Sequence, residues 1–214
     1  MTQTANGDHR RSVNSQRRAQ REEQILEAAM QLFAEHGYSD TDTQLLAEKL
    51  QVGKGTIYRY FPSKRELFLA AADRVMRLMR QSVDVRIQGI DEPFERLGVG
   101  IRAFLSFFAE HPEYVELLIQ ERAQFKDRKK PTYFVHREVN VKPWQTLYRT
   151  LIEAGRIRNM PVERITDVIG NLLYGTMFTN YFLGERPCVE KQARDILDVV
   201  FHGILSDSER KKGG

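Results

Sequence analysis

The stretch over residues 43–68, TQLLAEKLQVGKGTIYRYFPSKRELF, constrains the fold more than any other part of the chain. Its apolar and small positions are Leu46, Ala47, Leu50, Val52, Ile57 and Tyr60. This spacing packs two short helices across a tight turn. We expect a first helix over residues 43–50, a turn over 51–53 and a second helix over 54–60. The pattern is that of a helix-turn-helix, whose second helix enters the major groove of DNA.

The end of the second helix and the start of the next are also marked in this stretch. Pro62 pushes Phe61 out of the α region, so the second helix ends there. Ser63 and Glu66 form a capping box, in which each side chain bonds a backbone N–H of the other residue. Another helix therefore starts after Ser63, and its apolar spacing continues to about residue 87.

The run over residues 52–64, VGKGTIYRYFPSK, is similar over its whole length to the signature of the TetR family of bacterial transcriptional regulators. Two residues depart from the common pattern: Gln51 stands where many members have Gly, and Gly53 where many have Ser. A non-glycine residue at positive φ costs about 1 kcal/mol, whereas Gly in place of a Ser N-cap costs only about a few tenths. Neither departure threatens the fold. The resemblance implies a homodimeric, ligand-responsive regulator, most often a repressor, that binds a pseudo-palindromic operator.

The resemblance also implies which side chains contact DNA. The candidate DNA-binding residues are Thr43, Gln44, Lys54, Gly55, Thr56, Tyr58, Arg59, Tyr60 and Lys64. Thr56 and Arg59 are placed to touch bases, and most of the others are expected at phosphates. Arg59 is the favoured reader of guanine, because a guanidinium group can bond O6 and N7 together.

Three of these residues have a plainer alternative. The spacing of Tyr60 favours core packing for its ring, with only the hydroxyl free for DNA. For Lys54 and Lys64 the alternative is a solvated surface charge, and the motif favours DNA contact over it.

The N-terminal residues 1–16 are polar and are expected to be a disordered basic arm. Arg10 and Arg11 lie in this arm, and Arg17, Arg18 and Arg21 follow it. Two readings remain open. The arm is either a solvated tail or an extension that reaches DNA phosphates or the minor groove, as homeodomain arms do.

The rest of the chain keeps helical spacing, and no convincing strand appears. The fold class is therefore all-α, with about nine helices. Pro143 lies inside a helical pattern over residues 132–155, and because proline removes a backbone hydrogen bond we expect a kink or break over 140–143. The predicted domains are the arm over 1–16, a DNA-binding domain over 17–65, a ligand-binding and dimerisation domain over 66–206 and a flexible tail over 207–214.

The eighth and ninth helices, starting near residues 162 and 189, are apolar on more than one face. One face can close the core of the subunit while another packs against a second subunit. The resemblance implies a homodimer through this pair, as a four-helix bundle across a two-fold axis. It also implies that the helix opened by Ser63 passes the ligand state to the DNA-binding helices.

Aromatic side chains are concentrated in the C-terminal part, and most of them should be core. The resemblance, and not the spacing, implies a pocket here for a small apolar or aromatic effector. Its expected lining is Phe104, Phe108, Trp144, Tyr148, Tyr174 and Phe178, with Arg122, His136 and Asn171 as polar anchors. The alternative is a DNA-bound adaptor with no small-molecule ligand, whose C-terminal domain docks a protein partner. The two differ in whether apolar compounds shift thermal stability.

Composition excludes several other classes. The net charge of +4 permits nucleic-acid binding without proving it. The single cysteine, Cys188, excludes an internal disulfide and a cysteine-based zinc site, and suits a reducing cytosol. The five histidines are scattered, and no phosphate loop or nucleophile motif occurs, so we expect no enzyme, cofactor or metal.

No apolar run approaches the ~20 residues of a membrane span, and the polar N-terminus is no secretory signal. We therefore expect a soluble, cytoplasmic protein.

Overall fold

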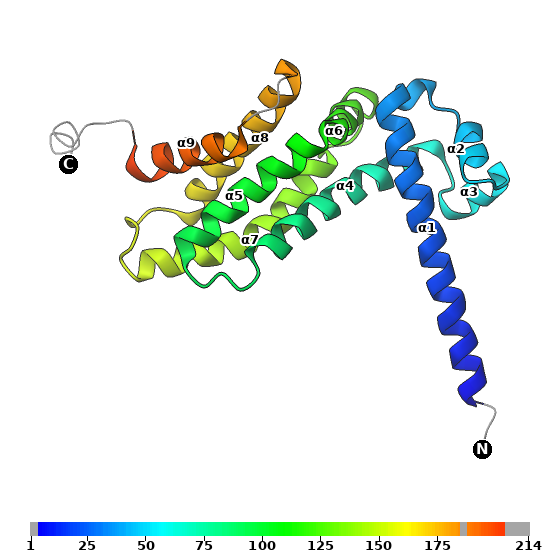
Figure 1. Ribbon diagram of the computed structural model, residues 1–214, viewed down its shortest axis with the longest axis horizontal. Coiled ribbons are helices and arrows are strands. Elements are labelled where there is room, and N and C mark those ends of the chain that lie inside the picture. The colour runs from blue at the N-terminus through cyan, green and yellow to red at the C-terminus, as the bar shows by residue number, and fades with distance from the viewer. Residues whose placement is uncertain (1–3, 185–187, 204–214) are drawn as a thin grey trace. The chain divides into compact units, whose positions relative to one another are not determined.

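The computed structural model describes residues 4–184 and 188–203, with side chains from residue 13 onward. Within these residues the chain is all-α, as predicted, and forms nine helices (Figure 1). The helices are α1 (Thr4–Asp40), α2 (Thr43–Lys49), α3 (Lys54–Tyr60), α4 (Lys64–Ile87), α5 (Pro93–Glu110), α6 (Pro112–Gln124), α7 (Thr132–Glu153), α8 (Val162–Leu183) and α9 (Val189–His202). None of the helices described is long and apolar enough to span a membrane.

Helix α1 begins much earlier than the sequence predicts. Residues 1–16 are expected to be disordered, whereas the backbone is helical from Thr4. Adding a residue to an existing helix is easy because each one gains a hydrogen bond, and no proline interrupts residues 4–40. The buried Ile25 and Phe33 anchor the C-terminal half of the helix. Gly37, with φ 78°, interrupts the regular helix.

The chain divides into two compact units. The first contains residues 1–76 and 116–133, and the second contains residues 77–115 and 134–214. The predicted boundary between residues 65 and 66 differs from this division. The N-terminal half of α4, most of α6 and the α6–α7 loop group with the DNA-binding helices. The predicted tail over residues 207–214 lies outside the described residues.

The core of the first unit explains why α6 belongs to it. Ile57 of α3 is fully buried, and the rings of Phe33 and Phe68 meet edge to face at 4.9 Å. Phe125, just after α6, packs edge-on against Phe68 at 5.5 Å and against Tyr38 at 4.9 Å. Burying one such side chain contributes about 2 kcal/mol. The aromatic cluster therefore ties the end of α6 to α1 and α4.

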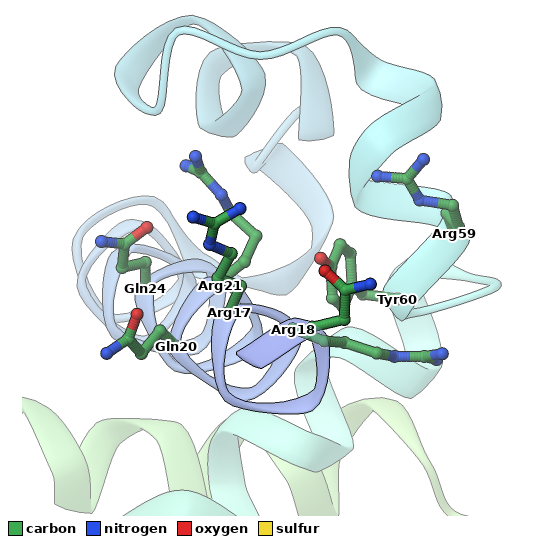
Figure 2. Close-up of a pocket in the computed structure, with 8 residues that line it drawn as sticks. Arg17, Arg18, Gln20, Arg21, Gln24, Arg59 and Tyr60 are labelled. Atoms are coloured by element: carbon green, nitrogen blue, oxygen red, sulfur yellow. The ribbon is translucent and has the colours of Figure 1, made fainter. Parts of the chain in front are cut away.

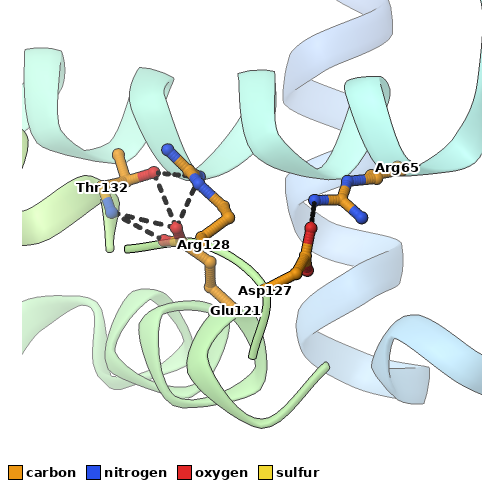
Figure 3. A network of polar contacts seen from close by, with 5 residues as sticks. All are labelled: Arg65, Glu121, Asp127, Arg128 and Thr132. Carbon is orange, nitrogen blue, oxygen red and sulfur yellow. Dashed lines mark hydrogen bonds and ion pairs between the residues drawn. The ribbon is translucent and has the colours of Figure 1, made fainter. Parts of the chain in front are cut away.

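A polar network holds the α6–α7 loop in the same unit (Figure 3). Glu121 is 1% exposed and accepts hydrogen bonds from Arg128 Nη1 at 2.6 Å and from the Thr132 backbone N–H at 2.9 Å. These partners offset the cost of burying a carboxylate. Arg65 at the start of α4 donates to Asp127 at 2.5 Å, and this bond lowers the pKa of the Asp127 carboxyl. The loop is thus bonded to the helix that follows α3.

In the second unit, α5 packs against α8 and α9. Its buried face includes Leu97, Ile101 and Leu105. Gly100 lies on the same helix beneath the indole of Trp144, and an added Cβ would lie 2.5 Å from Trp144 Cη2. A side chain at this position would therefore displace the tryptophan.

The predicted break at Pro143 is wrong. Helix α7 is continuous from Thr132 to Glu153 with Pro143 inside it. Packing on both sides of the proline offsets the lost backbone hydrogen bond. Tyr148 and Leu151 are buried after it, and Asn140 accepts a hydrogen bond from Arg80 of α4 at 3.0 Å before it.

Helices α8 and α9 are bonded to each other and leave an apolar surface uncovered. The side chains of Asn180 and Gln192 exchange two hydrogen bonds, of 3.0 and 2.7 Å. Gly184 ends α8 with φ 67°, in the left-handed region that favours glycine. The large apolar side chains exposed on this pair are Val168, Leu172, Phe182, Leu183 and Val199. The core of a single subunit does not account for these residues.

Candidate nucleic-acid interface

Asp42 fixes the start of α2 and also reaches α3. Its Oδ1 accepts hydrogen bonds from the Gln44 backbone N–H at 2.8 Å and from Lys54 Nζ at 3.0 Å. The bond from Gln44, and after it the bond from Lys54, lower the pKa of the Asp42 carboxyl. The same carboxylate raises the pKa of Lys54. Lys54 is therefore a fixed positive charge at the N-terminus of α3.

The turn between α2 and α3 has the geometry that the sequence predicts. Gln51 has φ 53°, in the left-handed region that favours glycine. Backbone bonds from Gln51 N to Glu48 O at 3.0 Å and from Val52 N to Ala47 O at 2.9 Å close the turn. Gly53 has φ −72° and caps α3 without a side-chain bond. The strain of about 1 kcal/mol therefore falls on Gln51 alone.

Helix α3 has one buried and one exposed face. Ile57 is fully buried, whereas Gly55, Tyr58 and Arg59 are exposed. The Tyr58 hydroxyl lies 3.0 Å from Thr43 Oγ1, so this pair joins α3 to α2. The Thr43 side chain is consequently engaged within the protein. The face left to solvent carries a phenol and a guanidinium group at adjacent positions.

Two more predicted phosphate contacts are held in place by the protein. Lys64 Nζ donates to the Ser39 backbone carbonyl at 3.0 Å and lies 4.8 Å from the centre of the Tyr38 ring. Gln44 Nε2 donates to Glu48 at 3.0 Å. The lysine charges at residues 54 and 64 are thus positioned by the protein and are not freely solvated.

Tyr60 is not the core residue that its spacing favours. Its side chain is half-buried, and the guanidinium groups of Arg18 and Arg59 lie 5.8 and 5.7 Å from its ring centre. Cations attracted to the face of a ring in this way gain about 0.5–1 kcal/mol at exposed sites. Tyr60 therefore connects α3 with α1.

A groove beside this tyrosine contains residues that the sequence does not point to (Figure 2). Its lining is Asn14, Arg17, Arg18, Gln20, Arg21, Gln24, Arg59 and Tyr60. Asn14, Gln20 and Gln24 have no motif that marks them. Helical spacing places Gln20 and Gln24 beside the arginines, whereas Asn14 lies in the segment over 1–16 that is expected to be disordered.

Residues 25–71 match the sequence model of a family described as bacterial regulatory proteins, tetR family. The matched segment contains α2, α3 and their buried contacts with α1 and α4. This segment of the chain belongs to the TetR family.

Curated relatives of the chain are transcriptional regulators, and not enzymes. It is 34% identical over 104 residues to YhgD, an uncharacterized HTH-type transcriptional regulator of Bacillus subtilis (strain 168). The match covers 49% of this chain and 54% of YhgD. It is 32% identical over 85 residues to the HTH-type transcriptional repressor KstR of Mycobacterium tuberculosis (strain ATCC 25618 / H37Rv), covering 40% of this chain and 39% of that protein. The chain thus matches about half or less of the length of these relatives.

Solved structures resemble the chain over a longer stretch. FadR from Bacillus subtilis, in complex with stearoyl-CoA, has a TM-score of 0.69 at 19% identity, covering 85% of this chain and 98% of that chain. The TetR family regulator PfmR from Thermus thermophilus has a TM-score of 0.66 at 24% identity, covering 85% and 99%. At these identities the likeness establishes the all-α fold.

The aromatic residues predicted to line an effector pocket form more than one group. Phe104 and Phe108 of α5 are buried and meet edge to face at 5.1 Å. Tyr174 and Phe178 of α8 are half-buried, with ring centres 4.6 Å apart. Phe134 of α7, which the prediction leaves out, lies 5.3 Å from Tyr174. The effector lining stays a prediction, with Phe134 as an added neighbour.

The two α7 members of the set also differ from each other. Trp144 is half-buried and lies over Gly100, whereas Tyr148 is buried. Burial raises the pKa of the Tyr148 hydroxyl, and to a lesser degree that of Tyr174. Both phenols are therefore neutral hydrogen-bond donors at physiological pH.

The predicted polar anchors differ in their surroundings. Asn171 is exposed and accepts a hydrogen bond from Arg137 at 2.9 Å. His136 is half-buried on α7. Arg122 is exposed on α6 and belongs to the first compact unit, whereas the other members of the set belong to the second. Within the described part of the chain, no group of three His, Cys, Asp or Glu side chains could hold a metal ion.

Proposed function

We propose that the chain is a sequence-specific DNA-binding transcriptional regulator that inserts α3 into the major groove. One observation carries this proposal: α3 buries Ile57 and presents Tyr58 and Arg59 to solvent, with the fixed charges of Lys54 and Lys64 nearby. Phosphate contacts fix the register of a protein on DNA, and base contacts give specificity. Arg59 has the donors that guanine requires.

The proposed active form is a homodimer through α8 and α9. The exposed apolar side chains on this pair, led by Phe182 and Leu183, support it. A two-fold axis makes the same patch complementary to itself. Two α3 helices would then enter successive major grooves of a pseudo-palindromic operator, with half-sites about 34 Å apart. An operator on the chromosome would place the regulator in the cytoplasm.

We further propose that the regulator is a repressor released by a small apolar or aromatic effector in the second unit. The aromatic side chains of α5, α7 and α8 support this, as does the stearoyl-CoA bound in the FadR complex. KstR, a relative, is named a repressor. By linkage, the effector must bind the DNA-incompetent dimer more tightly than the DNA-competent one.

The second candidate is a DNA-bound adaptor with no small-molecule ligand, whose second unit docks a protein partner. Asn171 favours it, because its side chain is exposed and is already bonded to Arg137 instead of being free to anchor a ligand. Both candidates keep the same DNA-binding role for α3.

Selection of bound duplexes from a random-sequence library tests the shared part of both candidates. We expect enrichment of one pseudo-palindrome with half-sites one helical turn apart, and enrichment of no sequence would overturn the proposal. Thermal unfolding with long-chain acyl-CoA esters and aromatic acids then separates the candidates. A compound that raises Tm and weakens operator binding supports the effector, whereas operator binding without any such shift favours the adaptor.

A further inference from the structure

The N-terminal half of α1 presents a basic face where its C-terminal half presents an apolar one. Asn14, Arg17, Arg18 and Arg21 occupy positions i, i+3, i+4 and i+7, which share one side of a helix. One and three turns beyond Arg21 on the same side, Ile25 and Leu32 are buried in the core of the first unit. Core packing therefore explains the second half of this face and leaves the first half unexplained.

This basic face and α3 form the two sides of one groove. The groove has a volume of about 740 Å³, and Figure 2 shows the arginines of α1 on one side and Arg59 on the other. As the structure describes it, the lining has four guanidinium groups, three side-chain amides and one phenol, and no carboxylate. The side chains around it are therefore nearly all hydrogen-bond donors.

Six arginines elsewhere in the described part of the chain have their charge offset by a carboxylate. Those that pair with a carboxylate are Arg65, Arg74, Arg80, Arg128, Arg137 and Arg156. On α1 itself, Glu23 pairs with Arg74 of α4. Among side chains that the structure describes, Arg17, Arg21 and Arg59 have no such carboxylate partner. Uncompensated like charges that share a groove repel each other, and an anion in the groove relieves that repulsion.

The composition of the groove indicates a polyanion and not a small metabolite. Pockets for small molecules are lined mainly by apolar and aromatic side chains with a few polar groups, whereas Tyr60 is the single aromatic residue in the lining described here. Arginine and amide side chains are the usual donors to phosphate and sugar oxygens of DNA. Because Arg59 belongs to both the groove and α3, DNA that meets α3 also lies at the groove.

We propose that this groove binds the sugar–phosphate backbone of the DNA beside the half-site that α3 enters. Arg17 and Arg21 contact phosphates, and Arg18 is held at the entrance by the Tyr60 ring. This inference rests on the proposed function. It assigns the α1 arginines to affinity and leaves base discrimination to α3.

The salt dependence of binding tests this assignment. A protein releases counterions from each phosphate that it neutralises, so log Kd rises with log [salt] by about 0.9 per contact. The double variant Arg17→Gln, Arg21→Gln removes up to two contacts per subunit. For a dimer we expect the slope to fall by about 3 to 4. Binding should weaken by a similar factor on the selected operator and on a scrambled duplex, because phosphate contacts carry no base information.

Fluorescence anisotropy of the full chain with both duplexes, from about 50 to 200 mM KCl, gives the slopes. The matched control is Arg149→Gln, which removes an exposed guanidinium from α7. Equal melting temperatures for all variants establish that the groove variant is folded. The inference is overturned if the groove variant keeps the slope of the unaltered chain, or if the control lowers the slope equally. If the unaltered chain fails to prefer the selected duplex over the scrambled one, the proposed function fails, and that result is distinct because it does not involve the variants.

Discussion

Helix α3 and the pair α8–α9 each bury one face and leave another in solvent, but their exposed faces have opposite chemistry. On α3 the exposed side chains are Tyr58 and Arg59, which water solvates well. On α8 and α9 they include Phe182 at 71% exposure and Leu183 at 68%. Large apolar side chains exposed in such number on two neighbouring helices are typical of an interaction surface. The contrast indicates two partners: a polar, charged one for α3 and an apolar one for the helix pair.

The largest expected effect comes from placing charge on the apolar surface. In the variant Val168→Glu, Leu172→Glu, two carboxylates replace exposed side chains one turn apart on α8. In a dimer they would be buried without partners, which costs about 3–5 kcal/mol. We expect the dimer dissociation constant, measured by sedimentation equilibrium, to rise by at least about 100-fold.

The control for that variant is Val85→Glu, on α4, where the valine is 64% exposed. It adds one carboxylate at an exposed apolar position on another helix, and should leave the dissociation constant unchanged. A double variant that stays as dimeric as the unaltered chain would remove the distinction between the two surfaces.

A smaller effect is expected from the helix that supports the apolar surface. In Gly100→Ala the new Cβ would lie 2.5 Å from Trp144, so the indole must move. Overpacking of this kind costs about 1–3 kcal/mol, measurable by denaturant unfolding. Gly175→Ala is the matched control, because no atom lies within 4 Å of its added Cβ. Alanine there should stabilise α8 by about 0.5–1 kcal/mol. Equal effects at both glycines would show that Trp144 is not packed as described.

The smallest effect is expected when the charge of Asp42, which faces Lys54 of α3, is removed. Asn at position 42 can still accept the Gln44 N–H bond but loses the charge that faces Lys54. The folded pKa of Asp42 is lowered, so its contribution to stability is present above its unfolded pKa, about 4, and is lost as pH falls through the folded value.

Thermal unfolding of Asp42→Asn against the unaltered chain at a series of pH values measures this contribution. The unaltered chain should be the more stable at neutral pH, and the difference should shrink below about pH 4. The control is Asp91→Asn, in the loop before α5. A difference that does not change with pH would contradict the pairing of Asp42 with Lys54.

The DNA-binding helices could be predicted from the sequence because their determinants are local. The bounds of α3 follow from Gly53 before it and Phe61–Pro62 after it, and the start of α4 follows from Ser63, whose Oγ accepts the Glu66 N–H at 3.1 Å. The positive φ of Gln51 also follows from its place in the motif. Each of these signals acts within a few residues of the structure that it controls.

The remaining features depend on contacts between distant residues. Nothing near Pro143 in the sequence shows that Tyr148 and Leu151 anchor α7 strongly enough to keep it continuous. That α6 groups with the first unit and α8 with the second follows from packing between distant segments. The groove on α1 includes Asn14, which lies in the segment that polar composition predicts to be disordered and that the structure shows as helix.

Sequence reading by α3 is tested most directly by comparing the unaltered chain with Tyr58→Ala, Arg59→Ala on the selected operator and on a scrambled duplex, with Arg149→Ala as the control. For the unaltered chain and the control, we expect the operator to bind at least about 1,000-fold more tightly than the scrambled duplex. The double variant should bind both duplexes with similar, weak affinity, because its phosphate contacts remain. A double variant that keeps the full preference for the operator would contradict the assignment of α3 as the recognition helix.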